Sequence, residues 1–189
     1  GVEEELRRVL PVVQALESKG IPISVDTSKP EVMRATIKAG ATMINDINAL
    51  RSPGALKVVA DGGVTVCLVH MQGEPKYMQS DPQYKDVIVE VRDFLQQRID
   101  AVEAAGIVRE RIVIGPGFGF GKALKDNLKL LRYLDRFTDM GMPILAGLSR
   151  KSMLREITGN KKGGLVSSSV SAALLAAING ARILRVHDV

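Results

Sequence analysis

The chain has 189 residues, 46% hydrophobic and 25% charged, which is the composition of a globular protein. No apolar run reaches the roughly 20 residues that a membrane-spanning helix needs, and no signal-peptide pattern opens the chain. The single cysteine, Cys67, lies in an apolar run and cannot form an internal disulfide. These features predict a cytoplasmic protein that does not associate with membranes.

The net charge of +5 comes from basic residues scattered among acidic residues and leucines, and aromatic residues make up only 4% of the chain. Nucleic-acid binding is disfavoured, because it would need basic runs with interleaved aromatic residues. A small anionic ligand suits local basic clusters better.

Short runs rich in Val and Ile are typical of parallel strands that are buried on both faces. They cover residues 23–27, 42–47, 64–70, 111–116, 143–149 and 182–189. Helical spacing of apolar residues predicts helices between them, the second with Ser28 as its N-cap. The predicted helices are residues 2–18 with an interruption near Pro11, 30–39, 53–60, 84–105, 124–138 and 165–179.

Strand–helix alternation predicts an α/β fold with a parallel sheet, in one domain spanning residues 1–189. Polar residues collect at the carboxyl ends of at least five strands, which favours a (β/α)8 barrel over an open sheet with one switch point. Six strands are recognisable, and the chain begins on a helix and ends on a strand. We therefore expect an incomplete barrel that lacks its first two strands and its final helix.

The sharpest local signal is PGFGFGK, residues 116–122, in which alternating glycines let the backbone approach a ligand closely. The third glycine of a dinucleotide fingerprint is replaced by Phe120, and a phosphate-binding P-loop would need glycine where Pro116 stands. The alternative is a flexible strand-to-helix loop. Phe118 and Phe120 argue against that alternative, because both could clamp an aromatic ligand.

Two further motifs carry cations at strand ends. SRKS, residues 149–152, opens a helix, where cations are unfavourable unless a ligand or a carboxylate compensates them. In RVHD, residues 185–188, strand alternation would place Arg185 and His187 on one face, which suits a diphosphate. A surface or structural role is the alternative for each.

Asp26 and Asn45 end two other strands, and together they can read the donors and acceptors of a guanidine-like heterocycle. Asp46 can act as a helix cap. His70 stands without the partner spacing of a metal site, and no Ser/His/Asp triad or zinc pattern is present, so we predict no metal ligands in this chain.

Taken in order, VDTSKPEVMRATIKAGATMINDINAL, VCLVHMQGEPKYMQ, PGFGFGK, LSRKSML and RVHDV resemble dihydropteroate synthases over essentially the whole chain. The resemblance implies a (β/α)8 barrel that condenses 6-hydroxymethyl-7,8-dihydropterin diphosphate with p-aminobenzoate in folate biosynthesis. It also implies assistance by Mg2+, competition by sulfonamides at the p-aminobenzoate site, and a homodimer.

The resemblance assigns roles by position. The pterin would meet Asp26, Asn45 and Lys151, and Arg185 and His187 would hold the diphosphate. Ser152 would meet the carboxylate of p-aminobenzoate and Phe120 its ring, while Arg150 would order its own loop. Lys151, Arg185 and His187 are the residues expected to act in catalysis.

Three departures from the family pattern stand out. The family's Mg2+-binding asparagine loop and a substrate loop belong to strands that precede Gly1. Gly115 replaces an aspartate that faces the pterin, and residues 165–169 depart from the usual Arg-x-x-Gly-Ser. Two alternatives therefore stay open. One is a pterin-binding methyltransferase-like barrel, against which SRKS and RVHD count, and the other is a catalytically inactive remnant that binds a pterin or an anion.

Overall fold

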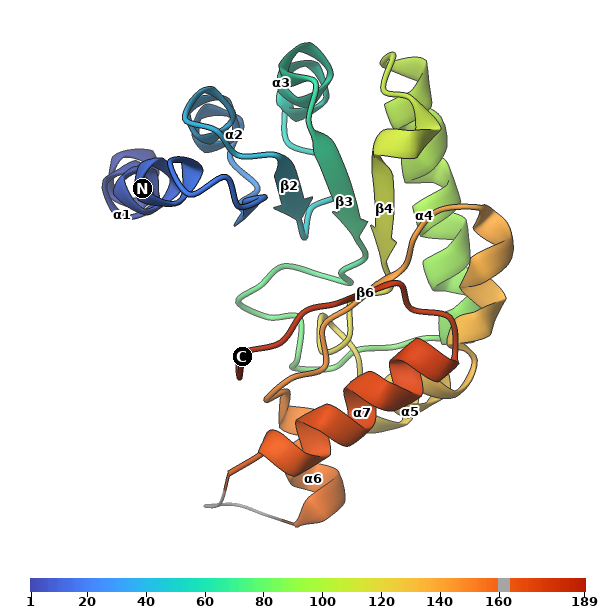
Figure 1. Ribbon diagram of the computed structural model, residues 1–189. Helices are drawn as coiled ribbons and strands as arrows, with labels where there is room; N and C mark the ends of the chain where they lie inside the picture. The colour runs from blue at the N-terminus through green and yellow to red at the C-terminus, as the bar shows by residue number, and fades with distance from the viewer. Residues whose placement is uncertain (160–163) are drawn as a thin grey trace. The chain divides into compact units, whose positions relative to one another are not determined.

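The computed structural model describes residues 1–159 and 164–189, in which helices alternate with parallel strands (Figure 1). These residues form two compact units: a first unit of residues 1–69 and 97–113, and a second unit of residues 70–96 and 114–189. Helix α4 (Val87–Ala104) and strand β4 (Ile112–Gly115) each contribute residues to both units. The prediction of one domain stays a prediction.

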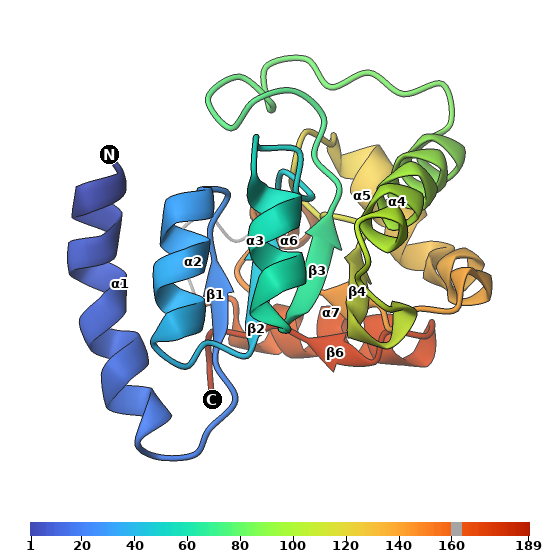
Figure 2. The same ribbon diagram turned by 90° about the horizontal axis from the view of Figure 1, so that it is seen from above.

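The first unit is built on parallel strands with helices along one face of the sheet (Figures 1 and 2). The sheet order is β1-β2-β3-β4, and each helix follows or precedes the strand it covers. Helix α2 packs against both α1 and α3. The elements are α1 (Val2–Glu17), β1 (Ser24–Asp26), α2 (Pro30–Lys38), β2 (Met43–Asp46), α3 (Ala55–Gly62), β3 (Thr65–Val69) and the 3-10 turn η1 (Arg109–Arg111).

Two helix predictions in this unit are wrong in detail. Helix α1 runs unbroken from Val2 to Glu17 with the exposed Pro11 inside it, so the predicted interruption is absent. Ser28 does not cap α2. Lys29 is the N-cap residue, Pro30 supplies a first turn that needs no N–H partner, and the Ser28 hydroxyl donates to Asp46 instead.

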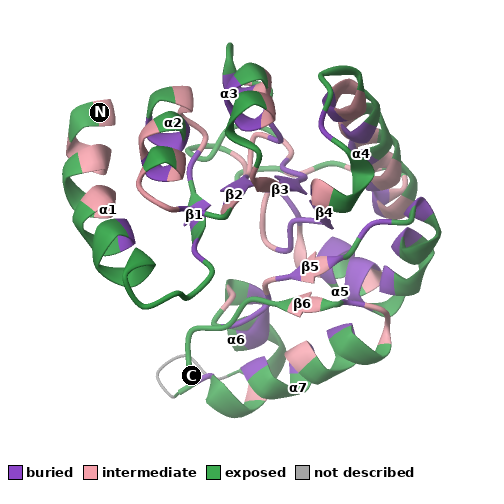
Figure 3. Ribbon diagram, turned by 45° about the horizontal axis from the view of Figure 1, so that its top comes forward, coloured by how far each residue is buried: buried purple, intermediate pink, exposed green. Residues whose placement is uncertain are grey.

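In the second unit, β5 pairs with β6 in parallel, with Leu145 opposite Ile183 and Ala146 opposite Leu184. Ile144 also forms a parallel bridge to Ile114 at the end of β4. The helices of this unit carry buried residues, and much of the α7 ribbon is coloured as exposed (Figure 3). The elements are α5 (Leu124–Arg132), η2 (Leu134–Met140), β5 (Leu145–Ala146), α6 (Ser152–Thr158), α7 (Val166–Ile178) and β6 (Ile183–Leu184).

The helix predicted at residues 124–138 is in fact α5 followed by the 3-10 helix η2. Leu134, Phe137 and Met140 are all buried, and their spacing of three residues matches the three residues per turn of a 3-10 helix. The strand predicted at residues 182–189 exists but is too long. Strand β6 covers only Ile183–Leu184, and the N–H of Arg185, donated to the carbonyl oxygen of Ala146, extends its ladder by one bond.

Candidate active site

Asp26 and Asn45 lie opposite each other at the carboxyl ends of β1 and β2. Asn45 belongs to β2, and the residue is 6% exposed. Its Oδ1 atom is buried without a hydrogen-bond partner in the part of the chain that the structure describes. A buried polar atom without a partner costs free energy, so this carbonyl oxygen is a place where a ligand donor would bind favourably.

Asp46 is fully buried directly after Asn45 and organises the turn that follows β2. Its carboxylate accepts hydrogen bonds from the backbone N–H groups of Asn48 and Leu50, each at 2.8 Å, and from the Ser28 hydroxyl. Burial raises the pKa of Asp46, although these three donors oppose the shift. Asp46 thus caps a turn and not a helix.

The same turn is held from outside by Arg98 of α4. Ala49 and Leu50 have φ angles of 49° and 57°, an unfavourable conformation for residues with side chains. Arg98 donates from Nε to the carbonyl oxygen of Ala49 at 2.8 Å. The turn that follows Asn45 and Asp46 is therefore fixed on two sides.

In the second unit, the loop after β4 bends back on itself at Gly117, Gly119 and Gly121, whose φ angles are 75°, 79° and 63°. A Cβ atom at Gly117 would overlap the carbonyl oxygen of His70, and one at Gly121 would overlap that of Gln72. Glycine is required at both positions for space as well as for conformation. The flexible-loop alternative does not fit this packing.

The two phenylalanines of PGFGFGK take different environments. Phe118 is 2% exposed and belongs to the core, so the expectation that both rings clamp a ligand is wrong for Phe118. Phe120 is partly exposed, and the ammonium of Lys151 lies 4.2 Å from the centre of its ring. A cation at this distance over a ring is a favourable cation–π contact.

Lys122, at the end of the same motif, points into the protein. Its Nζ atom lies 2.8 Å from the carbonyl oxygen of Gly117 and 2.9 Å from Nδ1 of His70. Burial lowers the pKa of Lys122 to about 7; the carboxylate of Asp126 opposes this shift and the ammonium of Lys151 adds to it. His70 is thus partnered by a lysine.

Gly115 is the last residue of β4 and its carbonyl oxygen accepts a 2.9 Å hydrogen bond from the N–H of His70. It is not among the described glycines with positive φ. The φ angle at this buried position therefore does not by itself require a glycine.

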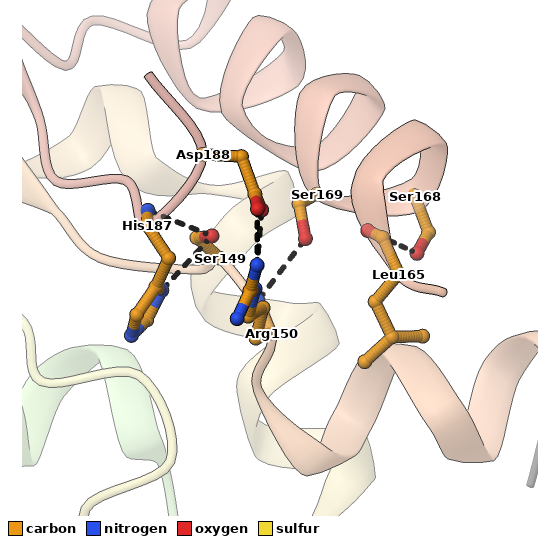
Figure 4. Close-up of polar contacts among 7 residues, drawn as sticks. All are labelled: Ser149, Arg150, Leu165, Ser168, Ser169, His187 and Asp188. Atoms are coloured by element: carbon orange, nitrogen blue, oxygen red, sulfur yellow. Dashed lines mark hydrogen bonds and ion pairs between the residues drawn. The ribbon is translucent and has the colours of Figure 1, made fainter. Parts of the chain in front are cut away.

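Ser149 joins the two cationic motifs (Figure 4). Its hydroxyl lies 3.3 Å from the backbone N–H of His187 and 3.1 Å from its Nδ1 atom. When the hydroxyl accepts from the N–H and donates its proton to Nδ1, a neutral His187 carries its own proton on Nε2, which is the tautomer used in the proposed function. The position of His187 is fixed by Ser149 and not by strand alternation, because β6 ends three residues earlier.

Arg150 forms an ion pair with Asp188, which raises the pKa of Arg150 and lowers that of Asp188 (Figure 4). Its own backbone has a φ of 57°, and its N–H donates to the hydroxyl of Ser169 at 3.0 Å. Arg150 therefore ties the loop after β5 to α7 and to the end of the chain.

Lys151 is the N-cap residue of α6, and Ser152 is the exposed first residue of that helix. Arg185 lies directly after β6, with its side-chain stem beside Gly147. Among the described residues, no group of three or more His, Cys, Asp or Glu side chains could hold a metal ion.

Sequence reasoning missed the roles of Ser149, Ser169 and Lys122 in holding loops. The only available signal for Ser149 was a hydroxyl at the end of an apolar strand. For Lys122 it was a lysine after three glycines, which equally fits a cation that faces a ligand.

A family model described as "Pterin binding enzyme" matches residues 1–187, and the chain belongs to this family. Within it, the chain is similar to the dihydropteroate synthase of Escherichia coli K12, with 49% identity over 189 residues, which cover all of this chain and 67% of that protein. The resemblance drawn from the sequence is confirmed.

Solved structures agree. The chain is 54% identical to a dihydropteroate synthase from Stenotrophomonas maltophilia, with a TM-score of 0.97 over 100% of this chain and 72% of that one. It is also 54% identical to the enzyme from Xanthomonas albilineans in complex with 7,8-dihydropteroate, with a TM-score of 0.94 over 100% of this chain and 70% of that one. A Yersinia pestis dihydropteroate synthase with a sulfonamide drug complex is 45% identical, with a TM-score of 0.96 over 98% of this chain and 68% of that one.

This match confirms the predicted fold class, an α/β fold of the (β/α)8 barrel type that is present in part. No helix among residues 1–159 and 164–189 is both long and apolar enough to cross a membrane.

Proposed function

We propose that this chain carries the dihydropteroate synthase reaction, the condensation of 6-hydroxymethyl-7,8-dihydropterin diphosphate with p-aminobenzoate to give 7,8-dihydropteroate and diphosphate. The observation that carries the proposal is the buried, unpartnered Oδ1 of Asn45 beside Asp26. A pterin offers N–H donors to such oxygens. The product complex of the Xanthomonas albilineans relative supports the same substrate class.

In the first unit, Asp26 and Asn45 recognise the pterin. A carboxylate and an amide oxygen at neighbouring strand ends accept from the amino and ring N–H groups of the heterocycle. The turn held by Asp46 and Arg98 keeps Asn45 in place, so little ordering is needed when the ligand binds.

In the second unit, Arg185 and His187 hold the diphosphate. The C–O bond to the leaving group breaks with both electrons on oxygen, and a stabilised methylene cation remains on the pterin. The Nε2–H of His187, fixed by Ser149, donates to the departing oxygen, while Arg185 stabilises its growing charge.

The amine of p-aminobenzoate then attacks the methylene carbon, forms the C–N bond and loses a proton to solvent. Phe120 lies along the ring of this substrate, and Ser152 meets its carboxylate. Lys151 contributes its ammonium to the pterin. Catalysis is positioning and leaving-group stabilisation, without a covalent enzyme intermediate.

Mg2+ is expected from the family resemblance. The described residues contain no group of three or more His, Cys, Asp or Glu side chains that could hold a metal ion, so the Mg2+ expectation stays a prediction. No step above is routed through the ion.

Titration calorimetry with a pterin tests the recognition step. Asn45→Ala should weaken binding at least tenfold, because it removes the unpartnered acceptor. Asn48→Ala is the matched control, since it removes an amide from the same turn that pairs with Ser52 and should change affinity less than twofold. Equal affinities for the wild type and Asn45→Ala would remove Asn45 from the site.

A methyltransferase-like barrel shares pterin recognition but needs no diphosphate site, so Arg185→Ala and His187→Ala separate the two functions. Both variants should weaken binding of inorganic diphosphate and leave binding of a pterin without diphosphate nearly unchanged. Equal loss for both ligands would contradict the assigned roles. A coupled assay for diphosphate release distinguishes a working enzyme from a remnant that only binds.

We further propose a cytoplasmic homodimer. Exposed apolar side chains on α7 support association, because burying them removes apolar surface from water. They include Val166, Val170, Leu174, Leu175 and Ile178. A monomeric mass by light scattering at micromolar concentration would contradict the dimer.

A further inference from the structure

His70 and Lys122 are buried and carry no part of the proposed reaction. We propose that Lys122, together with His70, is a positioning residue that locks the 117–121 loop and thereby holds Phe120 against Lys151. The functional consequence rests on the proposed function, in which Phe120 and Lys151 meet the substrates. The locking itself rests on geometry alone.

The environment of Lys122 matches its hydrogen-bonding capacity. An ammonium has three N–H donors, and Nζ has three good acceptors: Gly117 O at 2.8 Å, His70 Nδ1 at 2.9 Å and Phe120 O at 3.1 Å. Lysine is rarely buried unless it is paired in this way, and Lys122 is 2% exposed. The side chain thus bridges both ends of the loop to a residue outside it.

The neutral form of Lys122 also fits this environment. An amine can donate to the two carbonyl oxygens and accept from a proton on Nδ1 of His70, which the other tautomer of the imidazole provides. His70 can therefore match either protonation state of the lysine. Asp126 and Lys151 are the other charged groups that act on Lys122, and Tyr84 faces the imidazole with a ring-centre separation of 6.2 Å.

Other side chains fix the remaining polar groups of the loop. The carbonyl oxygen of Gly121 accepts from Tyr84 at 2.7 Å, and that of Gly119 accepts from Gln79. The N–H of Gly119 donates to Oδ1 of Asn127 at 2.7 Å. Lys122 is the member of this set that donates to two loop carbonyl oxygens at once. Its loss therefore removes more of the hydrogen bonds that fix the loop than the loss of any other member.

The outward result of this lock is the direction of Phe120. Its carbonyl oxygen is bound by Lys122, and its ring lies under Lys151. Releasing the carbonyl lets the peptide turn and moves the ring away from the ammonium. Lys122 therefore acts on substrate through Phe120 and touches no substrate itself.

A tryptophan reporter tests the lock without any substrate, because the chain contains no tryptophan. In a Phe120→Trp background, Lys122→Met should raise the acrylamide quenching constant of the indole at least twofold. Lys125→Met is the matched control, because Lys125 is exposed at the start of α5, and it should leave quenching unchanged. Unchanged quenching in a folded Lys122→Met protein overturns the proposal.

If Lys122→Met does not fold, the pair His70→Leu and His70→Gln carries the same test. Leucine removes one acceptor of Lys122 and should raise the quenching constant. Glutamine keeps an acceptor and should reverse at least half of that increase. Equal quenching in both His70 variants overturns the proposal.

The functional arm uses the chain with its native Phe120. Lys122→Met should raise the KM for p-aminobenzoate about tenfold while affinity for inorganic diphosphate stays within twofold. A general loss of structure would weaken both together. Altered quenching with an unchanged KM would overturn the link to substrate, and failure of the proposed synthase reaction would leave the quenching result readable.

Discussion

The loops after β2 and β4 are each held by a buried ionisable side chain that binds loop backbone, and the two side chains have opposite charges. Each follows a strand end and contains backbone in the left-handed region. After β2, the buried carboxylate of Asp46 accepts from backbone N–H groups, and after β4, the buried ammonium of Lys122 donates to backbone carbonyls. Burial raises the pKa of Asp46 and lowers that of Lys122, so in both residues the shift favours the neutral form of the side chain.

The comparison shows how a loop backbone can be fixed while a nearby side chain stays available to a ligand. In each loop the ionisable side chain forms hydrogen bonds with the loop backbone. A residue shortly before it in the chain, Asn45 before Asp46 and Phe120 before Lys122, is the one that we propose meets substrate. A charged residue in a sequence motif is therefore not by itself a residue that touches substrate.

The largest effect is expected for Asp46→Ala. It leaves one buried N–H group, one part-buried N–H group and a hydroxyl without their acceptor, so the free energy of unfolding should fall by about 3 kcal/mol. Urea denaturation measures this loss. Asp61→Ala is the control, because its exposed pair with Lys57 contributes little, and it should stay within about 0.5 kcal/mol of wild type. A loss below 1 kcal/mol for Asp46→Ala would show that Asp46 does not hold the loop after β2.

Lys151→Ala is the next largest change. The loss of a charged hydrogen-bond partner should weaken pterin binding by about 1.5–3 kcal/mol. Calorimetry measures the affinity, with Lys125→Ala as an exposed control. An affinity equal to that of wild type would show that Lys151 serves only Phe120.

Gly115→Asp sharpens the comparison by giving the second loop a carboxylate at its strand end. A carboxylate accepts two adjacent N–H donors of the pterin, so affinity should rise by about 1–3 kcal/mol, roughly ten- to a hundredfold. The melting temperature should stay nearly constant, because the backbone of Gly115 does not need positive φ. Gly115→Asn should gain less, since its amide offers one acceptor. A lower melting temperature without tighter binding would point to a structural need for glycine.

The smallest effect is a pH dependence with a defined sign. The pKa of Lys122 is about 7 in the folded protein, and its ordinary value, which applies to the unfolded chain, is 10.5. Between pH 7 and pH 10.5 the unfolded chain therefore binds more protons than the folded protein. Stability from this group therefore rises with pH, by about 1 kcal/mol between pH 7 and pH 8. Denaturation of wild type and Lys122→Met at both pH values measures the difference. Parallel pH profiles would show that Lys122 keeps an ordinary pKa.

The strand ends at Asp26 and Asn45 could be predicted from sequence because an apolar run followed by a polar residue marks where a buried strand leaves the sheet. The directions of Phe118 and Lys122 could not. They depend on the positive φ angles of the glycines between them, and glycine adopts either sign of φ equally well. The short β6 was also hidden, because Val186 continues the apolar alternation although the ladder has already ended.

The close approach of Gly117 and Gly121 to neighbouring carbonyl oxygens limits how the 117–121 loop can vary during evolution. A side chain at either position would overlap backbone, so a substitution there would disturb the fold of the loop. Phe120 lies between these two glycines and is partly exposed, so it can change without such an overlap. We therefore expect natural variation in this loop to fall on Phe120 before it falls on either glycine.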